Sequence, residues 1–193
     1  MSEFFYTGSR DNVVRKHKTT TGDVVATYTD GGGNDPRTMA INPNGLELYV
    51  LFSDGDIHVL DTSDLSLIKE FNVSISSSAG GAYSDGFFYV TGFSKNVDQV
   101  DIVNETKTSF TAPSSDTQRV VIGDDGFIYA GDKGGFVWKI DPETMSDAGS
   151  IDVSADVGGL IYYDGHVYAA SGSSTARLAK IDTATMSLVS SSS

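Results

Sequence analysis

The segment Asp124-Asp125-Gly126-Phe127-Ile128-Tyr129-Ala130-Gly131 decides the fold, because near-copies of it recur along the whole sequence. Each copy places a tyrosine inside a short apolar run, and in the later copies a turn-forming segment comes directly before that run. The other copies are Phe4-Phe5-Tyr6-Thr7-Gly8, Leu48-Tyr49-Val50, Phe88-Tyr89-Val90 and Val167-Tyr168-Ala169. The tyrosines at positions 6, 49, 89, 129 and 168 are therefore separated by 43, 40, 40 and 39 residues.

A period of this length, built from short β-patterned runs and turns, is typical of a β-propeller, whose blades are four-stranded sheets. Helical repeats would place apolar residues at i, i+3 and i+4, and these segments do not. The sequence predicts an all-β, five-bladed β-propeller that forms a single domain over residues 1–193. We expect the first blade to lack its innermost strand, because the sequence begins at the tyrosine strand. The blades are predicted at about 1–30, 36–73, 80–112, 118–154 and 157–190.

The tyrosine strands carry apolar residues on both sides of the pleat. Leu48 with Tyr49, Ile128 with Tyr129, and Val167 with Tyr168 are examples of such neighbours. A strand with one face in water would alternate polar and apolar residues. We therefore expect these strands to be covered on both faces, as they are when each blade stacks between two others.

The third strand of several repeats ends in a shared turn motif, which reads Leu60-Asp61-Thr62 in the second repeat and Ile181-Asp182-Thr183 in the fifth. A Tyr-Val strand followed by this turn resembles the YVTN-type and related β-propeller repeats. The resemblance implies a fold and no activity. It departs from the pattern in the number of repeats and in the third repeat, where Val103 is expected to replace the turn aspartate.

Two sets of repeated residues are expected to serve structure. The turn aspartates are predicted to accept hydrogen bonds from backbone N–H groups, since short acidic side chains do so in turns. The glycines before the tyrosine strands are predicted to adopt positive φ in a hairpin. The two sets are Asp61, Asp141 and Asp182, and Gly45, Gly86, Gly126 and Gly165.

Composition excludes several classes of function. The absence of cysteine rules out disulfides, a thiol nucleophile and cysteine-ligated metals. A formal charge of -13 argues against nucleic-acid binding, which needs clustered Lys and Arg. The N-terminal sequence has no secretion signal and no apolar span, so we expect no membrane insertion. The protein is expected to be made in the cytoplasm, and a role in a virion would follow by incorporation there.

Candidate binding residues lie in the loops that a propeller gathers around one end of its central channel, because binding residues concentrate in loops on a rigid scaffold. Two loops, at Asp35-Pro36-Arg37 and at 116–119, each combine an acid with an arginine. A plainer interpretation is that each arginine pairs with a neighbouring acid in solvent, worth about 0 to 1 kcal/mol. The candidate rim comprises Asp35, Arg37, Asp54, Asp56, Asp116, Arg119, Asp132, Lys133 and Asp156.

Catalytic motifs are missing from the sequence. It contains no phosphate-binding loop, no His-Glu-x-x-His and no Gly-x-Ser-x-Gly, so no catalytic residue is named and the chain is not expected to be an enzyme. No cofactor is expected either. A calcium ion remains an alternative, because propeller lactonases hold a cation with carboxylates and amides, but no metal-binding residue can be assigned.

The sequence therefore predicts a non-enzymatic binding or structural module that belongs to a larger assembly. The setting we favour is the surface of a virus or phage particle, as a capsid decoration, tail or host-attachment component, by analogy with other propellers. The partners would be other protein subunits or a surface glycan. Two alternatives are a carbohydrate-binding lectin, which needs equivalent sites in most blades, and a lactonase-like hydrolase with a cation in its channel.

Overall fold

The structure is a computed structural model that describes residues 3–75, 79–172 and 177–192. This part of the chain contains 19 strands and no helix. The chain divides into two compact units, Met1–Ser77 and Ser78–Ser193, and each is described by itself. The single domain expected over residues 1–193 stays a prediction.

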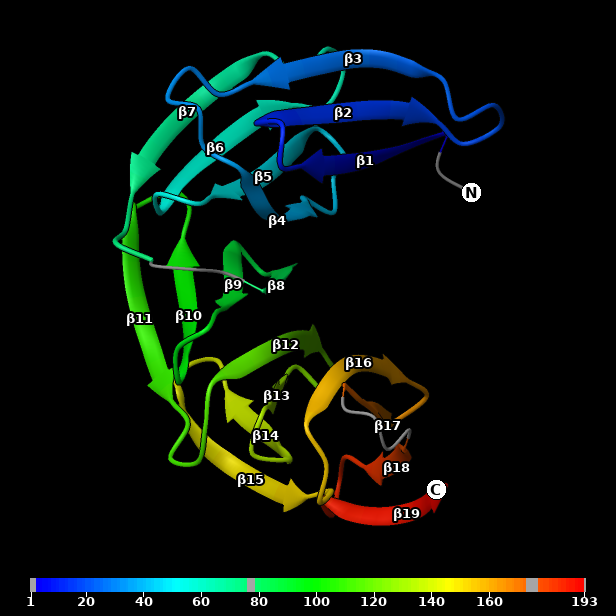
Figure 1. The fold of residues 1–193 in the computed structure, drawn as a ribbon. Helices are drawn as coiled ribbons and strands as arrows, with labels where there is room; N and C mark the ends of the chain where they lie inside the picture. Colours follow the sequence, from blue (N-terminus) through cyan, green and yellow to red (C-terminus); the bar gives the residue numbers. More distant parts are fainter. Residues whose placement is uncertain (1–2, 76–78, 173–176, 193) are drawn as a thin grey trace. The chain divides into compact units, whose positions relative to one another are not determined.

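All the sheets are antiparallel, and within each sheet the strands pair in chain order (Figure 1). We call the sheets blades 1 to 5 in chain order. In the first unit, blade 1 consists of β1 (Phe4–Ser9), β2 (Val13–Lys18) and β3 (Val24–Thr29), and blade 2 of β4 (Pro36–Ile41), β5 (Glu47–Phe52), β6 (Asp56–Asp61) and β7 (Leu67–Asn72).

The second unit contains three four-stranded blades. Blade 3 consists of β8 (Gly80–Ser84), β9 (Phe87–Thr91), β10 (Asn96–Asp101) and β11 (Thr106–Thr111). Blade 4 consists of β12 (Thr117–Ile122), β13 (Ile128–Asp132), β14 (Phe136–Asp141) and β15 (Ser146–Asp152). Blade 5 consists of β16 (Val157–Tyr163), β17 (His166–Ser171), β18 (Leu178–Asp182) and β19 (Ser187–Ser192). The predicted all-β class, the five sheets and the three-stranded first blade are thus confirmed.

In blades 2 to 5 the hairpin before the tyrosine strand forms as the sequence predicts. Gly126 has a φ of 81°, a conformation that glycine adopts without steric cost, and its N–H donates to the carbonyl of Gly123 at 3.1 Å. The equivalent glycines at 45, 86 and 165 also have positive φ. These turns fix where the tyrosine strands begin, and with it the register of each blade.

The turn aspartates also act as predicted. Asp141 Oδ1 accepts a hydrogen bond from the N–H of Glu143 at 2.8 Å, and Asp61 and Asp182 cap their turns in the same way. The prediction that Val103 replaces this aspartate in blade 3 is wrong. Asp101 pairs with Phe87 at the equivalent register position and accepts from the N–H groups of Val103 and Asn104, so every four-stranded blade keeps the turn.

Burial of the tyrosine strands depends on where the blade lies in the chain. In blades 2 to 4 the central residues of β5, β9 and β13 are buried on both faces, which confirms the prediction for these blades. In blade 5 the prediction is wrong for one face, since Val167 is buried while Tyr168 is only half-buried. Blade 1 is similar, with Phe5 exposed. Among the described residues, these two end blades each present one largely open face.

The apolar core is divided among the interfaces between successive blades. One cluster joins blades 1 and 2 around Val14 and Phe52. A second joins blades 3 and 4 around Phe110 and Trp138, and a third joins blades 4 and 5 around Tyr129 and Val167. Burial of such side chains contributes about 1.5 to 3 kcal/mol each. The faces between blades, rather than one central core, therefore hold each unit together.

Candidate binding sites

Three of the predicted rim acids occupy one repeated position. Asp35, Asp116 and Asp156 each stand directly before the first strand of a blade, where a register shift marks a bulge. Their backbone carbonyls accept hydrogen bonds from the residue that follows the second strand, at 2.9, 3.0 and 2.8 Å respectively. The loop closure is the same in all three blades, and only the side chains differ.

Two of these acids form surface ion pairs. Asp35 lies 3.5 Å from the Arg37 guanidinium, and Asp116 lies 3.3 Å from Lys133 Nζ, with both pairs partly exposed to solvent. The Lys133 ammonium also lies 5.0 Å from the Phe93 ring centroid. Exposed pairs of this kind contribute about 0 to 1 kcal/mol. These four charges are therefore already paired, although they remain accessible.

Arg119 does not pair with Asp116. Its Nε donates to the carbonyl of Gly158 at 2.8 Å, and one terminal nitrogen donates to the carbonyls of Ala79 and Gln118 at 3.0 and 2.9 Å. The guanidinium thus ties together the first strands of blades 3, 4 and 5, for which a planar group with several donors is suited. Its main contacts are structural.

Asp132 is fully buried and is held by three donors. Its carboxylate accepts from the indole N–H of Trp138 at 2.8 Å, from the N–H of Phe136 at 3.0 Å and from the hydroxyl of Ser114. A buried carboxylate is tolerated where hydrogen bonds satisfy its oxygens. Asp132 therefore organises the loop and is closed to a ligand.

The remaining acids of the rim differ in their contacts. Asp54 caps its own turn by accepting from the N–H of Asp56 at 3.1 Å, and Asp56 accepts from the Asn72 amide at 2.6 Å. Asp156 Oδ1 is buried and has no hydrogen-bond donor among the described residues. The structure thus does not bring the nine rim residues into one cluster, and their binding role stays a prediction.

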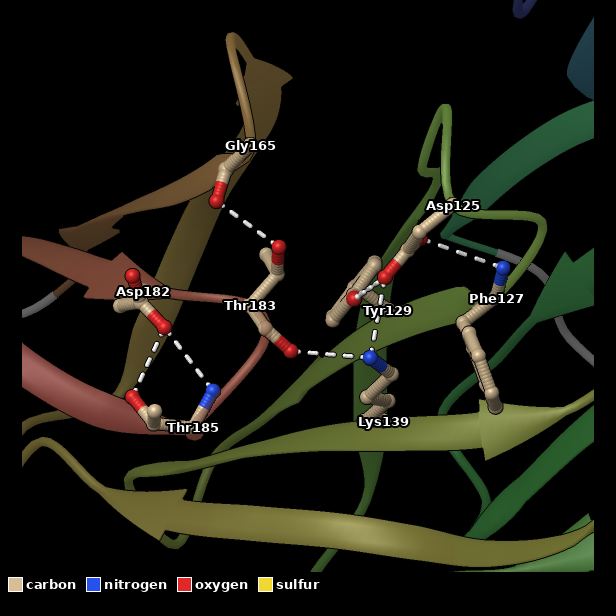
Figure 2. Close-up of polar contacts among 8 residues, drawn as sticks. All are labelled: Asp125, Phe127, Tyr129, Lys139, Gly165, Asp182, Thr183 and Thr185. Carbon is tan, nitrogen blue, oxygen red and sulfur yellow. Dashed lines mark hydrogen bonds and ion pairs between the residues drawn. The ribbon is translucent and has the colours of Figure 1, made fainter.

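A polar site that the sequence analysis missed lies between blades 4 and 5 (Figure 2). Lys139 Nζ donates to Asp125 Oδ2 at 2.9 Å and to the carbonyl of Thr183 at 2.8 Å. It also lies 4.1 Å from the centroid of the Phe127 ring, a cation–π distance. The Tyr129 hydroxyl donates to the same carboxylate oxygen at 2.6 Å. A carboxylate, a ring and a carbonyl of the next blade thus surround one ammonium group.

The charges at this site shift the ionisation of its members. Burial raises the pKa of Tyr129, and its hydrogen bond to Asp125 raises it further. For Asp125, burial opposes ionisation, but the hydrogen bonds from Tyr129 and Lys139 outweigh it, so the pKa of the carboxyl is below its usual value. The hydrogen bond from Lys139 thus favours the ionised carboxylate of Asp125.

The same contact recurs at other junctions within each unit. Lys16 Nζ donates to the carbonyl of Ser63 in blade 2 at 3.0 Å, and it lies 4.0 Å from the Phe4 ring. Gln99 Nε2 donates to the carbonyl of Pro142 in blade 4 at 2.8 Å. Each donor lies directly across the sheet from its repeat tyrosine. Lysine or glutamine ten residues after that tyrosine is the sequence signal that could have revealed this contact.

Blade 5 also has the donor, but no acceptor for it lies in the described part of the chain. Lys180 pairs with Tyr168 across the sheet and lies 5.7 Å from its ring centroid. In residues 3–75, 79–172 and 177–192, its ammonium has neither a hydrogen-bond acceptor nor an ion-pair partner. The surrounding face also exposes Ile161, Tyr163 and Leu178 to solvent, by 60, 69 and 48%.

A cavity of about 460 Å³ lies between blades 3 and 4. It is open to solvent on one side, and Phe87, Tyr89, Gln99 and Ile128 contribute to its wall. It is therefore large enough for a small organic molecule.

Metal and membrane sites were sought in the same part of the chain. Among the described residues, no three His, Asp or Glu side chains lie close enough together to hold a metal ion. The described residues likewise contain no helix long and apolar enough to cross a membrane.

Comparisons with known proteins identify the fold. No family model matches the chain, and no curated protein matches its sequence. One chain of the crystal structure of the Mitotic Checkpoint Complex is similar, with a TM-score of 0.80 and 14% sequence identity. The alignment covers 97% of this chain and 62% of the other, so this chain spans less than two thirds of that protein's length. The likeness shows a β-propeller fold, while the YVTN-type repeat stays a prediction.

Proposed function

We propose that this chain is a non-enzymatic β-propeller module that binds another protein within a larger assembly. The setting favoured by sequence analysis is the surface of a virus or phage particle, in a decoration, tail or attachment role. The observation that carries the binding role is the outer face of blade 5, defined by Ile161, Tyr163, Tyr168, Leu178 and Lys180. The similar solved structure is likewise a complex of proteins.

The corresponding face of blade 4 shows what such a surface contacts. Tyr129 and Val137 are fully buried there against blade 5, where Val157 and Val167 pack on them. Gly131 leaves room for this approach, since a Cβ atom on it would lie 2.3 Å from Val157. The blade 4 face is thus covered by small apolar side chains of the next sheet.

The outer face of blade 5 repeats this pattern of residues, but no sheet packs on it among the described residues. Tyr168 occupies the register position of Tyr129, Leu178 that of Val137, and Lys180 that of Lys139. Leu178 and Ile161 are exposed, whereas Val137 is fully buried. Apolar residues gathered on an exposed sheet face mark an interaction site.

The open face of blade 1 has a different character. Thr7 and His17 hydrogen-bond to each other at 2.8 Å, Phe5 stacks on His17, and Arg15 forms an ion pair with Asp11. These polar groups satisfy one another. The face of blade 5 differs, because it exposes apolar side chains.

The junction between blades 4 and 5 also supports a proposal for the chemistry of the partner. It should be a β-sheet with small apolar side chains, like Val157, Val167 and Ala169, and a turn carbonyl that accepts from Lys180. With a formal charge of -13 on this chain, a neutral or cationic protein is favoured over an acidic one. Continuity with an interface already present in the fold supports this choice.

The non-enzymatic part of the proposal is supported by the contacts of the rim. Asp132 is buried in hydrogen bonds, Arg119 binds backbone carbonyls, and Asp54 and Asp56 serve their own turns. These four rim residues are thus engaged in the scaffold.

The test is to fuse a β-sheet of the proposed kind next to the blade 5 face. The solvent accessibility of that face is then measured. The chain has no cysteine, so Ile161→Cys introduces a single thiol on this face. We expect that thiol to react rapidly with a maleimide in the parent protein. It should react at least tenfold more slowly after a second copy of residues 153–192 is fused behind residue 192, because a blade then covers it.

Val103→Cys is the matched control, because Val103 is 80% exposed in a turn at the edge of blade 3. Its thiol should react equally fast in both proteins. Equal reactivity of the position 161 thiol in both proteins would overturn the proposal that this face accepts a sheet. Light scattering over a range of concentrations then shows whether the parent binds further copies of itself or needs a different protein.

A further inference from the structure

The cavity between blades 3 and 4 is lined by residues equivalent to those that surround Lys139 in the junction between blades 4 and 5. Asp85-Gly86-Phe87-Phe88-Tyr89 in blade 3 matches Asp125-Gly126-Phe127-Ile128-Tyr129 in blade 4. Gln99 lies across from Tyr89, as Lys139 lies across from Tyr129. Both junctions therefore contain the same groups. These are an aspartate carboxylate, the rings of a phenylalanine and a tyrosine, and a backbone carbonyl of the following blade.

The two junctions differ in the side chain that lies beside the carboxylate and the aromatic rings. Lys139 fills its junction with an ammonium group that contacts Asp125, the Phe127 ring and the carbonyl of Thr183. Gln99 is neutral and one atom shorter, and its amide donates to Tyr89 and Pro142 at 3.1 and 2.8 Å. The glutamine thus keeps the contact between blades but supplies no charge beside Asp85.

The acids at the mouth of the cavity lack a positive partner. The Asp85 carboxylate accepts a hydrogen bond from the hydroxyl of Ser84 at 2.8 Å, and Glu143 also lines the opening. Among the described residues, neither forms an ion pair with Lys, Arg or His. In the blade 4 and blade 5 junction, the place of Glu143 is taken by Ala184, so blade 4 brings a second carboxylate to this cavity.

We propose that this cavity binds small primary amines in their ammonium form, beside the Gln99 amide that takes the place of Lys139 Nζ. The ammonium pairs with Asp85 and Glu143 at the mouth and lies over the Phe87 ring. The alkyl chain packs against Tyr89 and Ile128. An aromatic ring attracts a cation that lies over its face.

The occupied junction argues for an amine rather than a metal ion or a neutral ligand. A ring at 4.1 Å, as Phe127 presents to Lys139, favours an organic cation. A carboxylate beside an aromatic wall recognises charge and alkyl chain together, whereas a metal ion would need several oxygens around one point. The cavity of about 460 Å³ also exceeds what a bare ion requires.

The binding test is calorimetric titration of the intact protein with n-butylammonium chloride, against sodium chloride at equal ionic strength. We expect saturable binding of one equivalent. n-Butanol has nearly the same shape without charge, so it should bind at least tenfold more weakly. Equal binding of butanol would overturn the ammonium assignment, because the cavity would then recognise only the alkyl chain.

Gln99→Lys is the decisive variant, since it places an ammonium in the cavity from within. It should abolish binding of butylammonium and raise the melting temperature by pairing with Asp85. Asp85→Asn should weaken binding about tenfold or more, because a charge-assisted contact is lost. Asp23→Asn removes the same charge from an exposed turn in the first unit and should leave affinity unchanged within about twofold.

Two outcomes distinguish binding in the cavity from non-specific attraction of the cation to an acidic protein. If Gln99→Lys binds butylammonium as the unmodified protein does, the cavity is not the site and the proposal fails. If Asp85→Asn and Asp23→Asn weaken binding equally, the effect is one of overall charge and the proposal also fails. Loss of binding in Gln99→Lys at a higher melting temperature supports it, since the variant is then folded and self-occupied.

Discussion

Lys139 of blade 4 donates a hydrogen bond to the backbone carbonyl of Thr183 in blade 5 at 2.8 Å, while its charge is balanced by Asp125 of its own blade. One side chain thus serves both the interior of a blade and the junction to the next. Thr183 follows the turn aspartate Asp182. The repeated turn of one blade therefore accepts a hydrogen bond from the repeated donor of the preceding blade.

Replacing Lys139 by methionine should destabilise the protein. The variant removes the lysine donor from the Asp125 carboxylate and from the carbonyl of Thr183, which costs about 1 to 3 kcal/mol. Urea unfolding measures the loss. Lys18→Met removes an exposed lysine of β2 and should change the unfolding free energy by less than about 0.5 kcal/mol; equal losses in the two variants would contradict the contact.

Acid should weaken the same site. The pKa of Asp125 in the folded protein lies below its usual 3.8, so its stabilising effect is present above pH 3.8 and is lost as the pH falls through the lower, folded value. Lys139→Met removes part of the cause of this shift. The difference in unfolding free energy between the two proteins should therefore shrink as the pH falls from about 5 to about 2.

Tyr28 should titrate late in alkali. Burial, with the charges of Asp30 and Glu70 adding to it, raises the pKa of its phenol from 10.0 to about 12. The stability that this shift contributes is complete below pH 10.0 and is lost as the pH rises through about 12. Ultraviolet titration of the folded protein should show one fewer late-titrating tyrosine in Tyr28→Phe, and an unchanged curve would contradict the assignment.

Ile128→Ala should cost about 2 to 5 kcal/mol, because Ile128 is buried on the face between blades 3 and 4 and its truncation leaves a cavity. Ile161→Ala is the matched control, since Ile161 belongs to the next blade of the same unit and is largely exposed. Its cost should stay near about 0.5 kcal/mol in urea unfolding. Similar costs at both positions would contradict the burial of the tyrosine strand.

Arg119→Lys should destabilise more than Arg37→Lys. A lysine ammonium cannot reproduce the planar fork that binds the carbonyls of Gly158 and Ala79, so at least one buried acceptor is lost at about 1 to 3 kcal/mol. Arg37 makes an exposed pair with Asp35, which a lysine can replace at about 0 to 1 kcal/mol. Thermal unfolding in parallel compares the two.

Much of the fold was predictable because it depends on local rules that repeat. The glycine hairpins, the aspartate turns and the tyrosine strands follow from backbone geometry and hydrophobic patterning. Asp101 shows the limit of this approach: its turn was misaligned by two residues, since a turn aspartate is recognised by the register of its strand, and that register is set by pairing with Phe87.

The polar sites were less predictable, because they depend on which side chains meet across blades. Arg119 and Asp116 are close in sequence, yet the arginine binds carbonyls of the two neighbouring blades instead of the acid. Lys139 and Asp125 are 14 residues apart, and only the pairing of β13 with β14 brings them together. Strand pairing and the stacking of blades, and not spacing in the sequence, decide the partners of these residues.

Trp138, the one tryptophan of the chain, is almost completely buried between blades 3 and 4, with its indole N–H on the carboxylate of Asp132 and its ring beside Phe110. The protein therefore carries a single intrinsic fluorophore at one defined seam. A red shift of its emission would report the separation of blades 3 and 4. Quenching of the emission by iodide would measure the exposure of the indole to solvent without an added label.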